Sequence, residues 1–411
     1  MAMRRATRFR QVVRQRHLYP FESFCFHFKK AAREVAQIDG NPRLATTMVS
    51  RSAWERWMEG EIRGTPRADT SRILEHLLGE PADILFGPPH ATTQLEEQAE
   101  GRSPHLDAVT TFRLADRQLG GGHVYSSLLI YLRSEVAPSL IGLGQVQGSQ
   151  AFRDAAVLTE MAGWMAHDSG RDAVAHGHLV SALNFGQAVA DPTVAANVEA
   201  SMSHLALQGG HADQAVALAR SGLGRLRGIQ AMPVLASRLH AMKARALAAL
   251  GQAKQAQQSL DSAREELAAV DTALIPNWVA PFDEAALASE AASILLELRA
   301  FPEALDEAKR ALKLRDASRA RSRGFGQITL AKILIAQDQV EAACVVSDDL
   351  LDACQSLGSV RISRELADLQ VSLEPYGNSR PVKETLDRMS GVARHRRLLL
   401  ASLTVPEGPQ E

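Results

Sequence analysis

Aromatic residues are scarce in this sequence. Phe, Trp and Tyr make up 5 % of the 411 residues, although 45 % of all residues are hydrophobic. Alanine and leucine dominate that hydrophobic content instead. Because strands favour aromatic and β-branched side chains whereas helices favour Ala and Leu, the composition predicts an all-α protein. A chain of this length can form two or three domains, each with its own core.

Cysteine is also rare. Cys25, Cys344 and Cys354 form no Cys-x-x-Cys pair, and their odd number leaves at least one thiol outside any intrachain disulfide. All three lie in apolar segments with helical periodicity. We therefore expect buried, reduced thiols rather than a disulfide framework or a zinc site.

Long hydrophobic runs are missing as well. No segment reaches 18 uninterrupted apolar residues, and the stretch 124–143 is interrupted by Arg133 and Glu135. The Arg-rich first 16 residues lack the apolar region that follows the basic start of a signal peptide. An Arg-rich, acid-poor start is also found in mitochondrial presequences, but the apolar pattern here continues without a break. We expect a soluble, cytoplasmic protein that does not enter a membrane.

The common motifs of catalysis and metal binding are absent. Neither H-E-x-x-H nor G-x-S-x-G occurs, and no Gly-Lys-Ser/Thr follows the glycines at 120–122. His176 and His178 are two residues apart, about 200° around a helix, so they cannot face one ion. His167 and Asp168 are better read as residues that cap a helix end. The sequence predicts no enzyme, no metal and no cofactor.

The charge is distributed unevenly. The whole chain carries a formal charge of −1, but residues 1–72 contain 15 Lys and Arg against 7 Asp and Glu. This segment therefore has a net charge of +8 and the remainder −9. A basic amino-terminal module on an acidic body is typical of a protein whose first module binds a polyanion.

The stretch 49–64, VSRSAWERWMEGEIRG, predicts a short amphipathic helix over 52–63. Ser52 and Glu55 have the S-x-x-E spacing of a capping box. An apolar stripe is expected to face the core: Trp54, Trp57, Met58 and Ile62. The charged residues left off this stripe face water or a partner: Arg51, Glu55, Arg56, Glu59 and Arg63. Such a helix suits the major groove of DNA, although any docked surface helix has the same pattern.

Proline and glycine breaks organise the chain. They separate expected helices at 9–18, 21–38, 52–63 and 69–79 and a short turn around 81–86. Residues 1–87 are therefore predicted to form one compact helical module. Residues 88–106 are polar and predict a linker, 107–400 predict a helical solenoid, and 401–411 predict a disordered tail.

The solenoid prediction depends on a repeat. Short turns recur near residues 170, 210, 251, 300 and 337. Each lies between two apolar helical segments, and small residues follow at comparable positions: Ala215, Ala256, Ala304 and Ala342, with Ala175 a looser match. Small residues at helix crossings allow close backbone packing. The spacing predicts tetratricopeptide-like helical hairpins, and the alternative is an irregular helical domain.

Two segments resemble a known family. SRSAWERWMEGEIRGTPRADTSRILEHLLGEPADILFG is similar to the helix-turn-helix region of actinobacterial transcriptional regulators of the lambda-repressor-like (XRE) type. LTEMAGWMAHDSGRDAVAHGHLVSAL resembles the first repeat of the tetratricopeptide-like domain that follows in those regulators. Together the two runs cover about a fifth of the chain, and they occur in the family's order. Residues 36–49, between the expected scaffold helix and the reading helix, are longer than the family's connection.

The resemblance implies a DNA-binding module whose reading helix presents Arg51, Ser52, Glu55 and Arg56 to DNA. Arginine suits guanine edges and phosphates equally well. The remaining candidates for DNA contact are Arg63 and the predicted phosphate-binding residues Lys29, Lys30, Arg33 and Arg43. The alternative for all of them is a solvated helix face. Likewise, the basic cluster at 394–397 favours a helix terminus, with an acidic surface or a second DNA segment as its alternatives.

The sequence thus predicts a transcriptional regulator that binds duplex DNA. We expect it to bind as a homodimer on two half-sites, because one short reading helix gives modest specificity. Its solenoid would hold a peptide, small-molecule or protein effector, or would serve dimerisation. The main alternative is a protein–protein adaptor whose basic charge is incidental. An all-helical enzyme ranks last, because no catalytic constellation is found.

Overall fold

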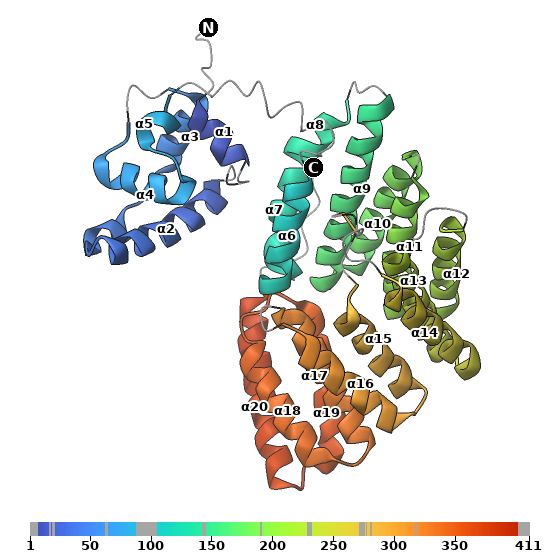
Figure 1. Ribbon diagram of the computed structural model, residues 1–411. Helices are drawn as coiled ribbons and strands as arrows, with labels where there is room; N and C mark the ends of the chain where they lie inside the picture. Colours follow the sequence, from blue (N-terminus) through green and yellow to red (C-terminus); the bar gives the residue numbers. More distant parts are fainter. Residues whose placement is uncertain are drawn as a thin grey trace, which may run out of the picture. The chain divides into compact units, whose positions relative to one another are not determined.

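The computed structural model describes residues 7–15, 18, 21–61, 65–87, 105–141, 145–189, 191–227, 232–270, 276, 278–279, 282–316 and 319–401. Within these ranges every regular element is a helix and no strand occurs (Figure 1). The all-α prediction is confirmed for this part of the chain. The chain forms two compact units, Met1–Arg102 and Ser103–Glu411. Most of the predicted linker and tail lies outside the described residues.

The described part of the first unit consists of five helices and one 3₁₀ turn. They are α1 (Arg8–Gln15), α2 (Phe21–Ile38), the 3₁₀ turn η1 (Pro42–Thr46), α3 (Arg51–Glu59), α4 (Ala68–Leu78) and α5 (Ala82–Leu85). The prediction for α2 is correct at both ends. The long connection between α2 and α3 holds only the single turn η1, which packs on α2.

Aromatic side chains build the core of this unit. Although Phe and Trp are rare, eight of the 16 in the chain lie within the first 86 residues. Phe9 stacks on Phe86 with ring centroids 5.0 Å apart and meets Trp57 edge to face at 5.6 Å. Phe24 and Phe28 extend the cluster along α2. Large rings bury much apolar surface per residue, which suits a unit of this small size.

Helix α3 is shifted from its predicted position. Its N-cap is Ser50, not Ser52, because Ser50 has the extended backbone of an N-cap and its hydroxyl accepts a bond from Ala53 N–H at 3.2 Å. The helix ends at Glu59, because Gly60 adopts a left-handed φ of 72°. The predicted end at residue 63 is therefore wrong, and residues 62–64 lie outside the described chain.

The second unit is a series of helices (Figure 1). It begins with α6 (Leu106–Leu119), α7 (Gly121–Tyr131), the π-helical turn η2 (Leu132–Val136) and α8 (Ala137–Ser139). Helical hairpins follow: α9 (Gln145–Asp168) with α10 (Asp172–Ala188), α11 (Pro192–Gln208) with α12 (Ala212–Arg225), and α13 (Pro233–Ala249) with α14 (Ala253–Ala268). The later pairs are α15 (Glu284–Glu297) with α16 (Phe301–Leu314), α17 (Ala320–Ala336) with α18 (Val340–Ala353), and α19 (Val360–Leu373), the 3₁₀ turn η4 (Glu374–Tyr376) and α20 (Arg380–Leu399).

The first five hairpins share one turn geometry. Each turn contains a residue with left-handed backbone: Gly170, Gly210, Gly251, Arg299 and Asp338, at φ between 60° and 80°. In every case the next N–H bonds to the carbonyl five residues earlier, as Arg171 does to Ala166 at 2.9 Å. This is the hydrogen-bond pattern of a Schellman C-cap. The repeat predicted from the turns is therefore present, with two of its turns formed by residues other than glycine.

The turn residue also sets the register of the small side chains. Five positions after it lies a fully buried alanine in every hairpin: Ala175, Ala215, Ala256, Ala304 and Ala343. The prediction of Ala342 is wrong by one residue, because a shift of one position rotates a side chain about 100° around the helix and exposes it. Ala175, treated as the loosest match, fits the register.

The two ends of the second unit meet. Arg321 on α17 donates to both carboxylate oxygens of Asp116 on α6 at 2.6 Å and to Asp168 on α9 at 3.1 Å. The Ser359 hydroxyl, at the start of α19, donates to Asp168 at 2.6 Å. Gly358 N–H bonds to the Leu119 carbonyl at 2.7 Å. The series of hairpins therefore curls until its last helices contact its first, which the sequence did not predict.

Glycine permits this closure. A Cβ atom on Gly120 would lie 2.8 Å from the backbone of Gly358, and one on Gly358 would overlap the ring of His123. Real Cβ atoms do not approach so closely. The glycines at 120–122, which do not match a nucleotide-binding loop, thus allow two backbones to pack together.

Two further predictions concern the cysteines and the basic cluster at 394–397. Cys344 and Cys354 are free and buried as expected, whereas Cys25 is only half-buried. In the basic cluster 394–397, Arg396 is 1 % exposed and donates to the Ser359 carbonyl at 2.6 Å and to the Cys354 carbonyl. It binds the loop between α18 and α19 rather than a surface partner.

Candidate functional site

The exposed face of α3 carries the predicted DNA-reading residues. Trp57 is buried, and Trp54 and Met58 pack against the same core, so the predicted apolar stripe is confirmed for these three residues. The opposite face is exposed, and four of the predicted residues lie on it: Arg51, Ser52, Glu55 and Arg56. The aromatic core thus fixes the direction in which this charged face points.

Arg51 is oriented by an aromatic neighbour. Its guanidinium lies 4.7 Å from the ring centroid of Phe21 at the start of α2, and the Phe21 ring in turn meets Trp54 edge to face at 5.8 Å. Stacking on an aromatic ring holds a guanidinium in place while its N–H groups stay directed outward. Arg56 lies on the same helix, and its side chain makes no ring contact, hydrogen bond or ion pair with another described residue.

The predicted phosphate-binding residues are also exposed. Lys29, Lys30 and Arg33 lie on α2, and Arg43 lies on η1. Lys30 is 3.9 Å from Glu34 on the same helix. No ion pair or hydrogen bond within the described residues joins these side chains to α3. Arg63 lies outside the described part of the chain.

Some arginines of the first unit form ion pairs within that unit. Arg72 on α4 donates to both oxygens of Asp39 at 2.9 Å, and this pairing lowers the pKa of the Asp39 carboxyl. Arg8 on α1 donates to Glu80 at 3.0 Å. These arginines connect helices, so α2, η1 and α3 carry the exposed candidates for a polyanion.

The suspected histidine–aspartate group is dispersed. His167 Nδ1 lies 2.6 Å from Asp172, and His178 Nε2 lies 2.8 Å from the Tyr125 hydroxyl. Asp168 is 2 % exposed and accepts the Gly121 N–H, so it caps α7 as well as binding Arg321. Among the described residues no three His, Cys, Asp or Glu side chains gather as a metal site would require.

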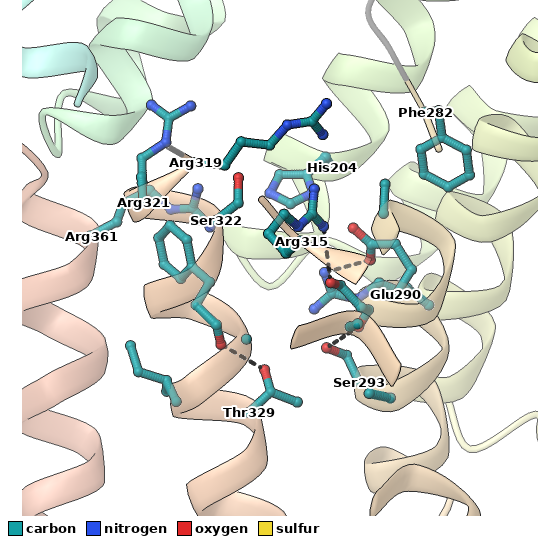
Figure 2. Close-up of a pocket in the computed structure, with 18 of the residues that line it drawn as sticks. His204, Phe282, Glu290, Ser293, Arg315, Arg319, Arg321, Ser322, Thr329 and Arg361 are labelled. Atoms are coloured by element: carbon teal, nitrogen blue, oxygen red, sulfur yellow. Dashed lines mark hydrogen bonds and ion pairs between the residues drawn. The ribbon is translucent and has the colours of Figure 1, made fainter. Parts of the chain in front are cut away.

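A cavity that the sequence did not predict lies inside the second unit. Its volume is about 370 Å³, and most of its wall comes from the first helices of successive hairpins together with α6 (Figure 2). Five of its arginines have a carboxylate within 4 Å: Arg238, Arg245, Arg315, Arg319 and Arg321. We call this space the arginine cavity.

Two more arginines of the arginine cavity have no such partner. Arg117 on α6 and Arg361 on α19 make no hydrogen bond or ion pair with another described residue, although Arg361 lies 4.7 Å from the ring centroid of Phe325. Burial, followed by the nearby charges of Arg319 and Arg113, lowers the pKa of Arg117 to about 10. Burial is also the main cause that lowers the pKa of Arg361. Both guanidiniums remain charged at neutral pH in a setting that disfavours the charge.

A buried histidine faces the same space. His204 on α11 is 9 % exposed, and its Nε2 atom has no hydrogen-bond partner in the described structure. Its ring lies 4.8 Å from that of Trp164. Burial, together with neighbouring cations, lowers the pKa of His204 well below its usual value, so the ring is neutral at pH 7. Figure 2 draws His204 on the cavity wall together with Arg315, Arg319, Arg321, Ser293 and Thr329.

The sequence contained a weak signal for this cavity. Arg238 and Arg245 are seven residues apart, which places them on one face of α13, and α17 begins with arginines at 321 and 323. Taken singly, each resembles an ordinary solvated residue. Their convergence requires helices up to 205 residues apart in sequence to meet, and this cannot be read from local periodicity.

The chain matches no known protein-family profile and no curated protein. Solved structures with similar arrangements of helices include the BtubC protein (BKLC) of P. vanneervenii, at 15 % identity and TM-score 0.38, covering 62 % of this chain and 96 % of that one. A signal-transduction ATPase with a tetratricopeptide repeat sensor from Pyrococcus horikoshii is 12 % identical with TM-score 0.42, and 91 % of this chain spans about half (52 %) of that protein. IFIT1 bound to m7Gppp-AAAA is 12 % identical with TM-score 0.35, covering 95 % and 92 %.

These similarities concern helical arrangement alone. Among the described residues, no helix is both long enough and apolar enough to cross a lipid bilayer.

Proposed function

We propose that this protein is a transcriptional regulator whose first unit binds duplex DNA through α3. The observation that carries the proposal is an exposed charged face, with Arg51 and Arg56, on a short helix whose other face is fixed in an aromatic core. A helix held in this way can enter a major groove without rearranging. The net charge of +8 on residues 1–72 supplies the general attraction to phosphates.

In this proposal α2 and η1 support α3 on the DNA backbone. Lys29, Lys30 and Arg43 are exposed and carry the charge that phosphate contacts need. One short reading helix gives modest sequence specificity, so we further propose that two copies bind two half-sites as a homodimer. The second unit would then contribute dimer contacts, an effector site, or both.

Fluorescence anisotropy of the full-length protein with labelled DNA from upstream of its own gene tests the proposal. We expect Arg56→Ala to weaken binding by about 5- to 100-fold, the loss of one good arginine contact. Arg380→Ala is the matched control: it removes another exposed arginine, from the second unit, where Arg380 pairs with Glu384 one turn away. It should leave DNA affinity unchanged.

Two results would contradict the proposal. One is equal displacement by scrambled and upstream DNA, and the other is binding that Arg56→Ala does not alter. A partner protein that stays bound at high salt while DNA is ignored would instead favour the adaptor function. Light scattering of the same sample, with and without DNA, measures whether the bound species is a dimer.

A further inference from the structure

The arginine cavity holds more positive charge than its own carboxylates neutralise. Seven arginines line it, against three lining acidic residues, Asp116, Glu290 and Glu365. Three carboxylates behind the wall, Glu160, Asp168 and Asp283, also pair with lining arginines, which leaves one positive charge in excess. Glu365 also forms an ion pair with Lys332 at 2.6 Å. Lys332 does not line the cavity, so this pair takes up negative charge that the lining arginines would otherwise share. A cluster of like charges in a half-enclosed space is unfavourable unless an anion completes it.

Arg117 and Arg361 show where that anion belongs. The other five arginines each reach a carboxylate, whereas these two have none among the described residues. They enter from α6 and α19, which belong to opposite ends of the second unit. An anion between them would therefore contact both sides of the closure that Arg321 makes with Asp116 and Asp168.

An independent observation points to the same place. His204 lines the cavity, and its buried Nε2 atom has no hydrogen-bond partner among the described residues. Hydroxyl groups of Ser322, Ser289 and Ser293 lie along the same wall. Buried polar atoms in folded proteins are nearly always satisfied, by protein, water or a bound molecule.

The wall also offers apolar surface. Trp164, Phe282 and Phe325 line the cavity beside the arginines. Pockets that bind small molecules combine an apolar wall with a few polar anchors, and their volumes begin at about 300 Å³. A volume of about 370 Å³ matches a compact metabolite.

We propose that the arginine cavity binds a small organic anion with at least two negative charges, held by Arg117 at one side and Arg361 at the other. Phosphate and carboxylate groups share the geometry that guanidinium recognises. The apolar wall would hold the body of the molecule, and His204 would bond one of its polar atoms. The proposal assigns an effector class to the proposed regulator, but anion binding itself does not depend on DNA binding.

Thermal unfolding of the full-length protein, followed by tryptophan fluorescence, tests this proposal. Pyrophosphate, ATP and citrate would be added separately at millimolar concentration, with sodium chloride keeping the ionic strength constant. We expect at least one of them to raise the melting temperature of the second unit by about 4 °C, because a molecule that binds only the folded state stabilises it. A larger shift with pyrophosphate and ATP than with citrate would indicate that the cavity prefers phosphate to carboxylate groups. A larger shift with ATP than with pyrophosphate would indicate that the apolar wall binds the body of the ligand.

The variants Arg117→Gln and Arg361→Gln separate a binding role from a structural one. Without added anion, each should melt at the same temperature as the wild type or higher, because an unpaired cation has been removed. With the stabilising anion, each should lose the shift, and calorimetry should show affinity at least tenfold weaker. Arg388→Gln is the control: this surface arginine pairs with Asp348 and Asp352, none of the three lines the cavity, and the variant should keep the shift.

Three outcomes would overturn the proposal: no shift with any of the three anions, an equal shift in the Gln variants, or a lower melting temperature of both Gln variants without anion. DNA affinity is tested with variants of α3, not with these cavity variants. A failure of the anion proposal therefore leaves the DNA-binding proposal standing, and a failure of DNA binding leaves the anion proposal standing.

Discussion

At the scale of single residues, buried charges decide how the second unit closes. Asp168 is 2 % exposed and accepts bonds from Arg321, Ser359 and Gly121. Burial alone would raise the pKa of its carboxyl, but Arg321 and the two hydrogen bonds outweigh burial and lower it. The carboxylate is thus stable in the folded protein only because three separate segments surround it.

Asp168→Asn should reduce the free energy of unfolding by about 1.5–3 kcal/mol at pH 7, the range for hydrogen bonds to a charged group. Because the folded-state pKa is lowered, the contribution of Asp168 is present above its unfolded pKa of about 3.9 and is lost as pH falls through the folded pKa. The difference between the wild type and the variant should therefore shrink below about pH 4. Urea denaturation at several pH values measures it, and a constant difference would contradict this account.

His204 also makes stability fall as pH falls, but in the mildly acidic range. Its pKa is lowered in the folded state, so folding is favoured while the ring is neutral. Stability should fall as pH drops below the unfolded pKa of about 6.5, by up to about 1.4 kcal/mol per pH unit. In His204→Gln the loss between pH 7.5 and 5.5 should be smaller by about 1 kcal/mol. An unchanged slope would mean that folding does not lower the pKa of His204.

At the scale of helices and turns, the sequence predicted much of the second unit. Turn positions and small residues follow from local chemistry, because a left-handed residue ends one helix and fixes which face of the next is buried. The prediction failed where two local signals competed. Ala342 and Ala343 are adjacent, and only the turn at Asp338 determines that Ala343 faces inward. Ser50 and Ser52 posed the same problem at α3, where the extended backbone of Ser50 decided the cap.

The position of the α3 cap can be tested by paired substitutions. Ser50→Ala should lower the stability of the first unit by about 1 kcal/mol, the usual value for loss of an N-cap. Ser52→Ala should change it by less than about 0.5 kcal/mol, as expected for an exposed position without a cap bond. Chemical denaturation followed by the fluorescence of Trp54 and Trp57 reports on this unit. A larger effect from Ser52→Ala would restore the predicted capping box.

The two turns without glycine are a further test. Arg299 and Asp338 both have a φ of 60°, which is unfavourable for residues with a Cβ atom. Arg299→Gly should therefore stabilise the protein by about 0.5–1 kcal/mol. Gly210→Ala should destabilise it by about 1 kcal/mol or more, although there is space for the methyl group. Gly177→Ala, in an open position on α10 with ordinary helical φ, is the control and should be neutral or stabilising.

At the scale of the whole molecule, the sequence could not predict the arginine cavity or the closure that forms it. Asp116 and Arg321 are 205 positions apart, and each has the appearance of a surface residue in its own helix. Periodicity identifies the apolar stripe of a helix, but it does not show which distant helix will cover its polar face. The candidate DNA-reading face could be predicted because it depends on local sequence alone. Helix α3 has nine residues, and their spacing puts the aromatic side chains on one side and the charged ones on the other.

The salt dependence of DNA binding tests the central claim most directly. For the full-length protein between about 50 and about 200 mM salt, the logarithm of affinity should fall linearly with the logarithm of salt concentration, with a slope of about −0.9 for each phosphate contact. Arg43→Ala should make the slope shallower by about one and weaken all DNA sequences equally, whereas Arg56→Ala should act mainly on the upstream sequence. A slope near zero, or one that neither substitution changes, would contradict the assignment of DNA binding to the first unit.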